Sequence, residues 1–339
     1  MEHTKLKLLR VLDILRETDE EHPYTTNEII RNLSLFGIEA ERKSVLRDIS
    51  ALQDYGYDIL LHPDNKRGYY LASRTFEDWE LKILMDAAVG ANFLTAENSN
   101  RLANKISTMT STNGRKTLLA VTPLSTSVKN GDPTTKNAID ILLTAIRKGK
   151  KVGFQYTYTG SDLKKHLRFE GHEYPVSPYA MIWRQDRYYL IGSYGSYDKL
   201  SYYRLDRIRN IRVMDEPAVD MEKFLGENAK IKLQEFVDRN LNNYSGGTTK
   251  ICLEVAESRV DLIVDTFGPN FQAEKGDAGK LIVRVTINDG WGLTSWLLQN
   301  GDCVKILEPQ RARDDFIHAL KLIGNQYGLD YSQEDSNEG

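Results

Sequence analysis

Residues that carry specialised chemistry are scarce in this chain. Its 339 residues include two cysteines, Cys252 and Cys303, and both lie in apolar runs of β type, which predicts buried free thiols rather than a disulfide or a redox pair. The six histidines are scattered without ligand-like spacing, and no glycine-rich phosphate loop or nucleophile elbow occurs. We therefore expect no catalytic residue, no metal site and no cofactor, and a protein that is not an enzyme.

Long apolar runs are also missing. No run approaches the roughly 18–20 residues that span a bilayer, and residues 1–20 predict an amphipathic helix rather than a signal peptide. A hydrophobic content of 40% and a charged content of 27% are typical of a soluble globular protein. We expect no membrane partner, a cytoplasmic location and, from the length, about two to four domains.

Charge is spread unevenly along the sequence. Residues 1–72 hold 10 basic and 13 acidic residues, whereas residues 136–214 hold 15 basic and 7 acidic residues together with 10 of the 18 tyrosines. Residues 215–339 are acidic, with 13 basic and 22 acidic residues. A basic, tyrosine-rich middle region is a candidate anion site, because cations attract anions and tyrosine offers flat stacking faces. The alternative is a β-barrel that uses tyrosine for its strand propensity.

Residues 1–72 predict three helices followed by a β-hairpin. The second helix is expected to begin at a threonine cap, Thr25 or Thr26, with Glu28 completing a capping box. The hairpin is expected in "DILLHPDNKRGYYLAS", where a six-residue turn separates two short β runs. Three helices and a hairpin are the order of a winged helix-turn-helix, whose third helix enters the major groove of DNA.

The predicted third helix, "ERKSVLRDISALQDYGYDI", carries one apolar and one polar face. Val45, Ile49 and Leu52 share the apolar face, and Lys43, Arg47 and Ser50 stand opposite. A merely solvated face is the alternative for an isolated helix, but in a winged helix-turn-helix this face meets double-stranded operator DNA. We predict DNA contacts from Thr26, Arg42, Lys43, Ser44, Arg47, Ser50, Lys66 and Arg67.

The remaining sequence predicts an α+β multidomain protein. Residues 73–133 are expected to be a helical linker and dimerisation region, in which "LLAVTPLSTSVKNGDP" is a strand or loop. Residues 134–215 predict a helix followed by the short strands of a small barrel, and residues 216–248 predict a linker. Residues 249–330 predict a ferredoxin-like βαββαβ order with a final helix that has Pro309 in its first position. The two cysteine-bearing strands would then be antiparallel neighbours with the cysteines at opposite ends.

The segment "SPYAMIWRQDRYYLIGSYGSYDKLSYYRLDRIRNI" resembles the WYL domain of bacterial transcriptional regulators. The triplet that names the family is Tyr188-Tyr189-Leu190, with tyrosine in place of tryptophan, and the second signature is Arg204-Leu205-Asp206-Arg207-Ile208. The order of domains also resembles these regulators, including the C-terminal extension called WCX. The resemblance implies an SH3- or Sm-like β-barrel, a homodimer, and a sensor of an anionic effector such as single-stranded nucleic acid or a nucleotide.

Several residues of this segment are suited to such a ligand. Alternation along the strand places Tyr188 and Tyr189 on opposite faces, so that one is core while the other meets ligand. Arg204 shares a strand face with Tyr202, and a guanidinium fork binds two phosphate oxygens at once. Arg207 is expected to meet ligand or, alternatively, to pair with Asp206 or with a nearby carbonyl. The predicted ligand residues are Tyr188, Tyr189, Tyr202, Arg204, Arg207, His166, Arg168 and Arg184.

The sequence is thus interpreted as a homodimeric DNA-binding transcriptional regulator whose WYL domain senses an anionic ligand. Two alternatives stay open: a nucleic-acid-processing accessory, which would need clustered carboxylates for metal ions, and a single-strand-binding protein without a specific operator.

Overall fold

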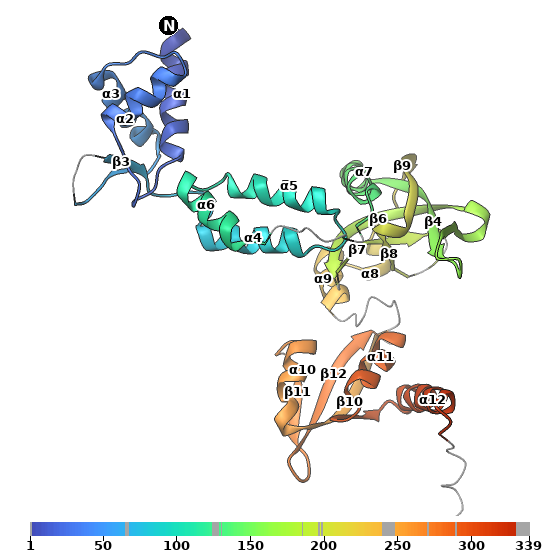
Figure 1. Cartoon of the computed structure of the whole chain (residues 1–339). Helices are drawn as coiled ribbons and strands as arrows, with labels where there is room; N and C mark the ends of the chain where they lie inside the picture. The colour runs from blue at the N-terminus through green and yellow to red at the C-terminus, as the bar shows by residue number, and fades with distance from the viewer. Residues whose placement is uncertain are drawn as a thin grey trace, which may run out of the picture. The chain divides into compact units, whose positions relative to one another are not determined.

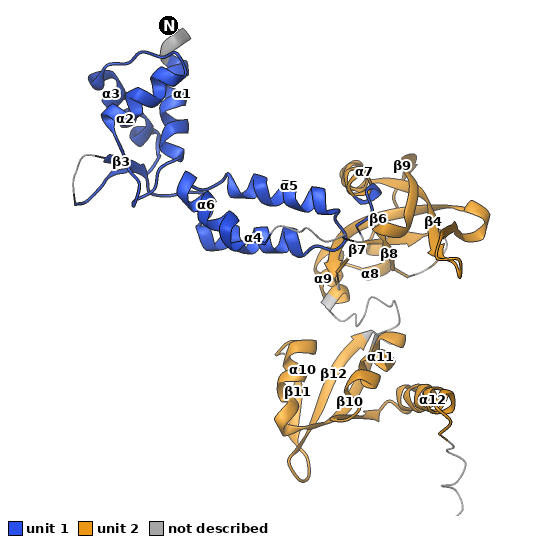
Figure 2. Ribbon diagram, in the orientation of Figure 1, with its two compact units in different colours: residues 1–135 blue, residues 136–339 orange. Residues whose placement is uncertain are grey.

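The computed structural model describes residues 2–64, 68–123, 129, 131–184, 186–195, 197, 199–238, 248–269, 271–288 and 290–329. Lys66 and Arg67, two predicted DNA contacts, lie outside these residues. The chain divides into two compact units, residues 1–135 and 136–339 (Figure 2). No helix in the described part of the chain is long and apolar enough to cross a membrane.

The first unit begins with three helices around one apolar core. These are α1 (Glu2–Arg16), α2 (Thr26–Leu35) and α3 (Arg42–Tyr55) (Figure 1). Leu15, Ile29 and Val45 are fully buried where the three meet. α3 ends at Gly56, whose φ of 113° lies in the left-handed region that glycine adopts at low cost. The predicted three-helix order is therefore present.

A three-stranded antiparallel sheet closes this part of the unit. β2 (Ile59–Leu61) and β3 (Gly68–Leu71) form the predicted hairpin, and β1 (Tyr24–Thr25) pairs with β3 to give the order β1-β3-β2. β1 is only two residues long and was not predicted from the sequence. Thr25 is the α2 cap: its hydroxyl accepts from the Glu28 amide, and its own amide donates to the Glu28 carboxylate at 2.7 Å. Thr26 is the first residue of α2.

Three more helices follow: α4 (Asp78–Gly90), α5 (Ala96–Ser107) and α6 (Thr112–Val121). α6 corrects the prediction of a strand or loop, since "LLAV" forms its last turn. The Ser111 side chain accepts from the Gly114 amide and caps this helix, and the buried Leu118 packs among α4 and α5 side chains. A cap and one buried leucine thus stabilise a helix that contains a glycine.

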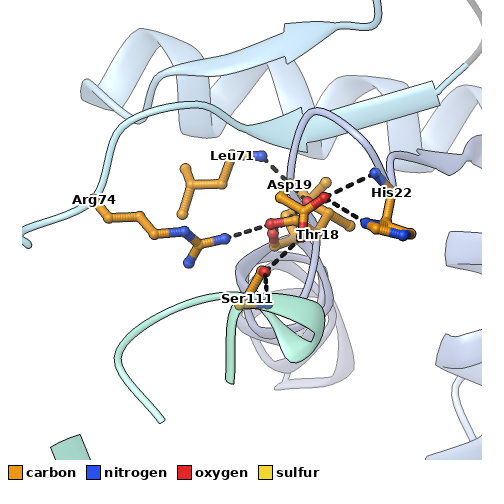
Figure 3. Close-up of polar contacts among 8 residues, drawn as sticks. Thr18, Asp19, His22, Leu71, Arg74 and Ser111 are labelled. Atoms are coloured by element: carbon orange, nitrogen blue, oxygen red, sulfur yellow. Dashed lines mark hydrogen bonds and ion pairs between the residues drawn. The ribbon is translucent and has the colours of Figure 1, made fainter. Parts of the chain in front are cut away.

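A polar cluster, which we call the clasp, ties the end of α1 to the hairpin and to α6 (Figure 3). Thr18 accepts from the Leu71 amide through its hydroxyl at 3.2 Å and from the Arg74 guanidinium through its carbonyl. Asp19 accepts from the Ser111 hydroxyl at 2.6 Å and from the His22 amide at 2.8 Å. Burial acts to raise the pKa of Asp19, but these hydrogen bonds outweigh it and the pKa is lowered.

The second unit opens with α7 (Thr134–Lys148) and a six-stranded antiparallel sheet. Phe154, Leu190 and Leu205 are fully buried in a core between them. The sheet has the order β5-β4-β6-β7-β8, and β9 also pairs with β4. Its members are β4 (Lys150–Thr159), β5 (Lys165–Leu167), β6 (Glu173–Arg184), β7 (Arg187–Tyr194), β8 (Ser201–Arg204) and β9 (Ile208–Pro217), with short helices η1 (Arg168–Gly171) and η2 (Leu205–Arg207).

Two short helices, α8 (Glu222–Leu225) and α9 (Ala229–Asp238), follow this sheet. The C-terminal part then has the order β10 (Thr248–Ala256), η3 (Glu257–Arg259), α10 (Val260–Phe267), β11 (Gln272–Lys275), β12 (Lys280–Asn288), α11 (Trp291–Asn300), β13 (Val304–Glu308) and α12 (Gln310–Gln326). Its antiparallel sheet has the strand order β11-β12-β10-β13. Pro309 is the cap of α12, one residue before its predicted position.

Both cysteines are free, as predicted. Cys252 lies in β10 opposite Glu308 at the end of β13, whereas Cys303 precedes β13, where its carbonyl accepts from the Ala256 amide. The neighbouring strands run antiparallel, so the two thiols lie at opposite ends of the pair.

Candidate nucleic-acid and anion-binding surfaces

The outer face of α3 is basic over its first two turns. Arg42, Lys43, Arg47 and Ser50 are exposed, while Val45, Ile49 and Leu52 are buried on the opposite side. Among the described residues, the side chains of Arg42 and Lys43 have no hydrogen bond or ion pair, and the Arg47 guanidinium only donates to the Lys43 carbonyl at 3.4 Å. Positive charge here is available to an outside partner.

Two of the residues predicted to contact DNA, Thr26 and Ser44, make contacts within the protein or are buried. Thr26 is buried, with 6% of the residue's surface exposed, so the structure does not present it for contact, and its role in DNA binding stays a prediction. The half-buried Ser44 accepts a hydrogen bond from the Lys7 ammonium, which also pairs with Asp48 at 2.9 Å. These three side chains join α1 to α3, so Ser44 supports the helix rather than forming its outer face.

A cluster of cations surrounds Asp206 in η2, and we call it the Asp206 cluster. Arg204 donates to both carboxylate oxygens, from Nε at 3.0 Å and from a terminal nitrogen at 2.7 Å. Arg187, at the start of β7, and Arg207 also act on this carboxylate through their charge. Arg204 thus pairs directly with the carboxylate, and the charges of two further guanidinium groups act on it, so positive charge exceeds negative charge in this region.

The electrostatics of this pair follow from its partial burial. Desolvation acts to raise the pKa of Asp206, but the hydrogen bonds and charge of Arg204, with the charges of Arg187 and Arg207, outweigh it and lower the pKa. The same hydrogen bonds raise the pKa of Arg204. The backbone amide of Arg204 donates to the Tyr156 hydroxyl at 3.0 Å, and burial raises the pKa of that tyrosine. Asp206 is therefore held as a carboxylate and orients the Arg204 fork.

The predicted alternative for Arg207 is corrected by this geometry, because Arg204 is the residue that pairs with Asp206. The Arg207 carbonyl accepts from the Thr157 hydroxyl at 3.0 Å. Among the described residues, its guanidinium has neither a hydrogen bond nor an ion pair, so it remains a candidate for ligand.

His166 and Arg168 lie at the edge of the same region. The Arg168 guanidinium is exposed and lies 6.0 Å from the centre of the Tyr156 ring. His166 is exposed and approaches the Asp162 carboxylate at 2.9 Å, which gives it a local partner. Arg168 is thus close to the Asp206 cluster through Tyr156, whereas His166 contributes to the neighbouring turn.

The tyrosine alternation is as predicted. Tyr188 is partly buried and packs against the core that contains Leu190, which favours the core alternative, and its contact with ligand stays a prediction. Tyr189 lies opposite Arg204 in the β7–β8 pair, and its ring meets the Tyr202 ring edge to face at 6.3 Å. Tyr189, Tyr202 and Arg204 therefore share the outer face of the sheet.

Helix α9 lies against this outer face. The Phe236 ring stacks on Tyr202 with centres 5.5 Å apart and planes 11° from parallel. Arg184, at the end of β6, donates to the Val237 carbonyl at 2.7 Å, close to the C-terminus of α9. Sequence reasoning missed Phe236, which is distant in the chain, and Arg187, which the run "RQDRYY" could have indicated.

The structure also has a hollow of about 730 Å³ in the first unit, beside the clasp. Five carboxylates line it, those of Asp19, Glu20, Glu21, Glu77 and Asp78, against one guanidinium, that of Arg74. This charge is unsuited to an anion. Within the described residues, no group of three or more histidine, cysteine or acidic side chains is arranged to hold a metal ion.

Comparison with known proteins agrees with the geometry of the second unit. The family model described as "WYL domain" matches residues 137–213. The chain contains a WYL domain. The model described as "WCX domain" matches residues 248–323, so this WYL-domain protein carries the WCX domain that the resemblance implied.

Two solved structures are similar to this WYL-domain protein at low identity. Proteasome accessory factor B/C (PafBC) of Arthrobacter aurescens is 17% identical, with 95% of this chain and 48% of that chain covered and a TM-score of 0.28. A CRISPR Cas-related protein is 11% identical, with 90% and 93% covered and a TM-score of 0.38. The chain thus spans about half the length of PafBC. No curated protein matches the sequence.

Proposed function

We propose that this WYL-domain protein is a homodimeric, DNA-binding transcriptional regulator that senses an anionic ligand, and that it is not an enzyme. The observation that carries the proposal is the outer face of α3, where Arg42, Lys43 and Arg47 are exposed and not neutralised by any described carboxylate. Arginine and lysine on the first turns of a helix that fits the major groove can contact both phosphates and base edges.

The architecture supports this reading. Three helices and the sheet β1-β3-β2 fit a winged helix-turn-helix over residues 1–72. A single turn, η2, joins the last two strands of the WYL domain, as expected of an SH3- or Sm-like barrel. The strand order β11-β12-β10-β13 with α10 and α11 fits a ferredoxin-like domain.

The Asp206 cluster is the proposed anion site. A bidentate guanidinium recognises phosphate or carboxylate by two parallel hydrogen bonds, and Arg204 already has its fork oriented by Asp206. Arg207 and Arg187 add positive charge that acts on the same carboxylate. A phosphate group, as in a nucleotide or a single-stranded nucleic acid, fits this surplus of guanidinium groups.

Exposed apolar residues on α4 support a dimer. Trp79 and Ile83 are one helical turn apart and are 61% and 58% exposed. A second copy that covered this face would place two α3 helices for the two halves of a palindromic operator.

The test is duplex binding to DNA fragments from around the protein's own gene and to unrelated duplexes of equal length. We expect wild type to prefer one fragment, and Arg47→Ala to weaken binding to it by about 1–3 kcal/mol while relaxing the preference. Arg16→Ala, which removes an exposed cation paired with Asp13 outside α3, is the matched control and should leave both unchanged. Equal binding of wild type to every duplex would contradict an operator and favour the single-strand-binding alternative.

A further inference from the structure

Helix α9 engages two of the predicted ligand residues at once. Phe236 covers the Tyr202 ring, and the Val237 carbonyl occupies the Arg184 guanidinium. The two ligand residues come from different strands, β8 and β6, and the two that engage them are neighbours on one helix. A single element of the chain thus supplies both an aromatic ring and a hydrogen-bond acceptor to the outer face of the WYL sheet.

These two contacts imitate what a ligand with a ring and an anionic group would make. The near-parallel stacking of Phe236 on Tyr202 is the contact that a nucleobase makes with an aromatic side chain. The Val237 carbonyl oxygen takes a guanidinium hydrogen bond that a phosphate oxygen would take more strongly, because a charged acceptor strengthens the bond. Tyr202 also shares its sheet face with Arg204 of the Asp206 cluster.

α9 is attached to the domain by few apolar contacts. None of its described side chains belongs to the buried core of the WYL domain, and Ala229 is the one buried residue among those described in the helix. Ile231 on the same helix is 64% exposed. A helix of 10 residues is marginal on its own, so the position of α9 depends on its contacts with the sheet and with α8, among them those of Phe236 and Val237.

We infer that α9 is a displaceable cover over the stacking subsite of the WYL ligand site, and that a ligand carrying a planar ring and a phosphate competes with Phe236 and Val237 for Tyr202 and Arg184. This inference rests on the proposed anion-sensing function.

If α9 covers the ligand site, it lowers the affinity for ligand. Removing the Phe236 ring should therefore raise that affinity. The probe is a six-nucleotide oligodeoxythymidylate, and its affinity is measured by fluorescence anisotropy with the full-length wild type, Phe236→Ala, Ile231→Ala and Tyr202→Ala. We expect Phe236→Ala to bind about two- to tenfold more tightly than wild type, which is the range that the loss of an aromatic pair allows. Ile231→Ala is the matched control on the same helix and should bind as wild type does. Tyr202→Ala should bind more weakly than Phe236→Ala.

Each outcome decides the matter. Tighter binding by Phe236→Ala, or binding by Phe236→Ala alone, supports the cover. Equal or weaker binding by Phe236→Ala, when wild type binds, overturns the cover and leaves the proposed sensor intact. If neither protein binds the oligonucleotide or mononucleotides, the proposed ligand class fails and the cover fails with it. Hydrogen exchange of the α9 amides in wild type gives a direct reading, since bound oligonucleotide should accelerate it and slower exchange would contradict displacement.

Discussion

The two basic surfaces of this protein hold their cations in different ways. On α3 the cations Arg42, Lys43 and Arg47 are exposed and, within the described residues, form no ion pair with a carboxylate. In the WYL domain, Arg204 is 26% exposed and is fixed by two hydrogen bonds to Asp206, which is 20% exposed. The cations on α3 are thus free to change orientation, whereas the guanidinium group of Arg204 is held in one orientation.

This difference suits the two surfaces to different partners. Exposed lysine and arginine side chains gain from a polyanion, on which many weak phosphate contacts add up and release counterions. An oriented guanidinium gains from one small anion of matching shape, because little side-chain freedom remains to be lost on binding. The contrast therefore supports the proposal that α3 binds duplex DNA and that the WYL domain binds the effector, and four predictions test it.

The largest effect is expected on α3. Lys43→Ala/Arg47→Ala should weaken duplex binding by about 10- to 100-fold at low salt and reduce the slope of log affinity against log salt by about 1, for the lost phosphate contact of Lys43, because Arg47 is proposed to contact base edges. Filter binding or anisotropy at four salt concentrations measures both quantities. Arg212→Ala is the control, because it removes an exposed arginine that pairs with Glu173 in the WYL domain. An unchanged slope in the α3 variant would contradict the proposal that duplex DNA binds to this face of α3.

For the free energy of unfolding, the larger effect is expected in the WYL domain and the smaller one on α3. Arg204→Ala leaves a partly buried carboxylate without its fork and should lower the free energy of unfolding by about 1–3 kcal/mol, whereas Lys43→Ala should change it by at most about 0.5 kcal/mol. Urea denaturation of the full chain gives both values. Arg204→Ala/Asp206→Ala should recover part of the loss, because no unpaired carboxylate remains. Equal stability of Arg204→Ala and wild type would show that the pair is not a fixed element of the domain.

The clasp ties the end of α1 to the hairpin and to α6. Ser111→Ala removes a helix cap and the bond to Asp19, whereas Thr95→Ala removes only the cap of α5. Ser111→Ala should therefore cost about 1 kcal/mol more in thermal unfolding than Thr95→Ala. Duplex affinity should stay within about twofold in both variants, since neither touches the outer face of α3. An equal loss in the two variants would mean that the Asp19 bond contributes nothing.

The smallest effect is the pH dependence. The folded pKa of Asp206 is lowered, so its ion pair contributes stability that is fully present above the unfolded pKa of about 3.9. That stability is lost as the pH falls through the lower, folded pKa. Asp206→Asn should therefore show a shallower fall in unfolding temperature below about pH 4 than wild type, measured by calorimetry. Parallel curves would contradict the lowered pKa.

Local sequence patterns predicted most of the secondary structure. The apolar repeat Val45, Ile49 and Leu52 predicts the buried face of α3, and alternation along β7 predicts that Tyr188 and Tyr189 face opposite ways. α6 was missed because Gly114 and the prolines and serines after it resemble a loop, while its cap and its buried Leu118 outweigh these propensities. β1 was missed because a strand of two residues is too short to show the alternation of apolar and polar side chains that indicates a strand.

The site was less predictable because its contacts join distant parts of the chain. Which of two arginines pairs with Asp206 depends on the turn of η2, and sequence alone left this open. Thr25 and Thr26 are equivalent as letters, but the backbone makes one the cap and buries the other. Phe236 lies 34 residues after Tyr202, so nothing near the tyrosine indicates that its face is covered.

The most direct test of the account is the coupling between the two basic surfaces. Affinity for the preferred duplex is measured with and without a short single-stranded oligonucleotide, for wild type and for Arg204→Ala/Arg207→Ala. The account predicts that the oligonucleotide changes duplex affinity of wild type by about 5- to 150-fold and leaves that of the double variant unchanged. An equal change in both proteins would contradict the Asp206 cluster as the sensor, and no change in wild type would contradict the oligonucleotide as its effector.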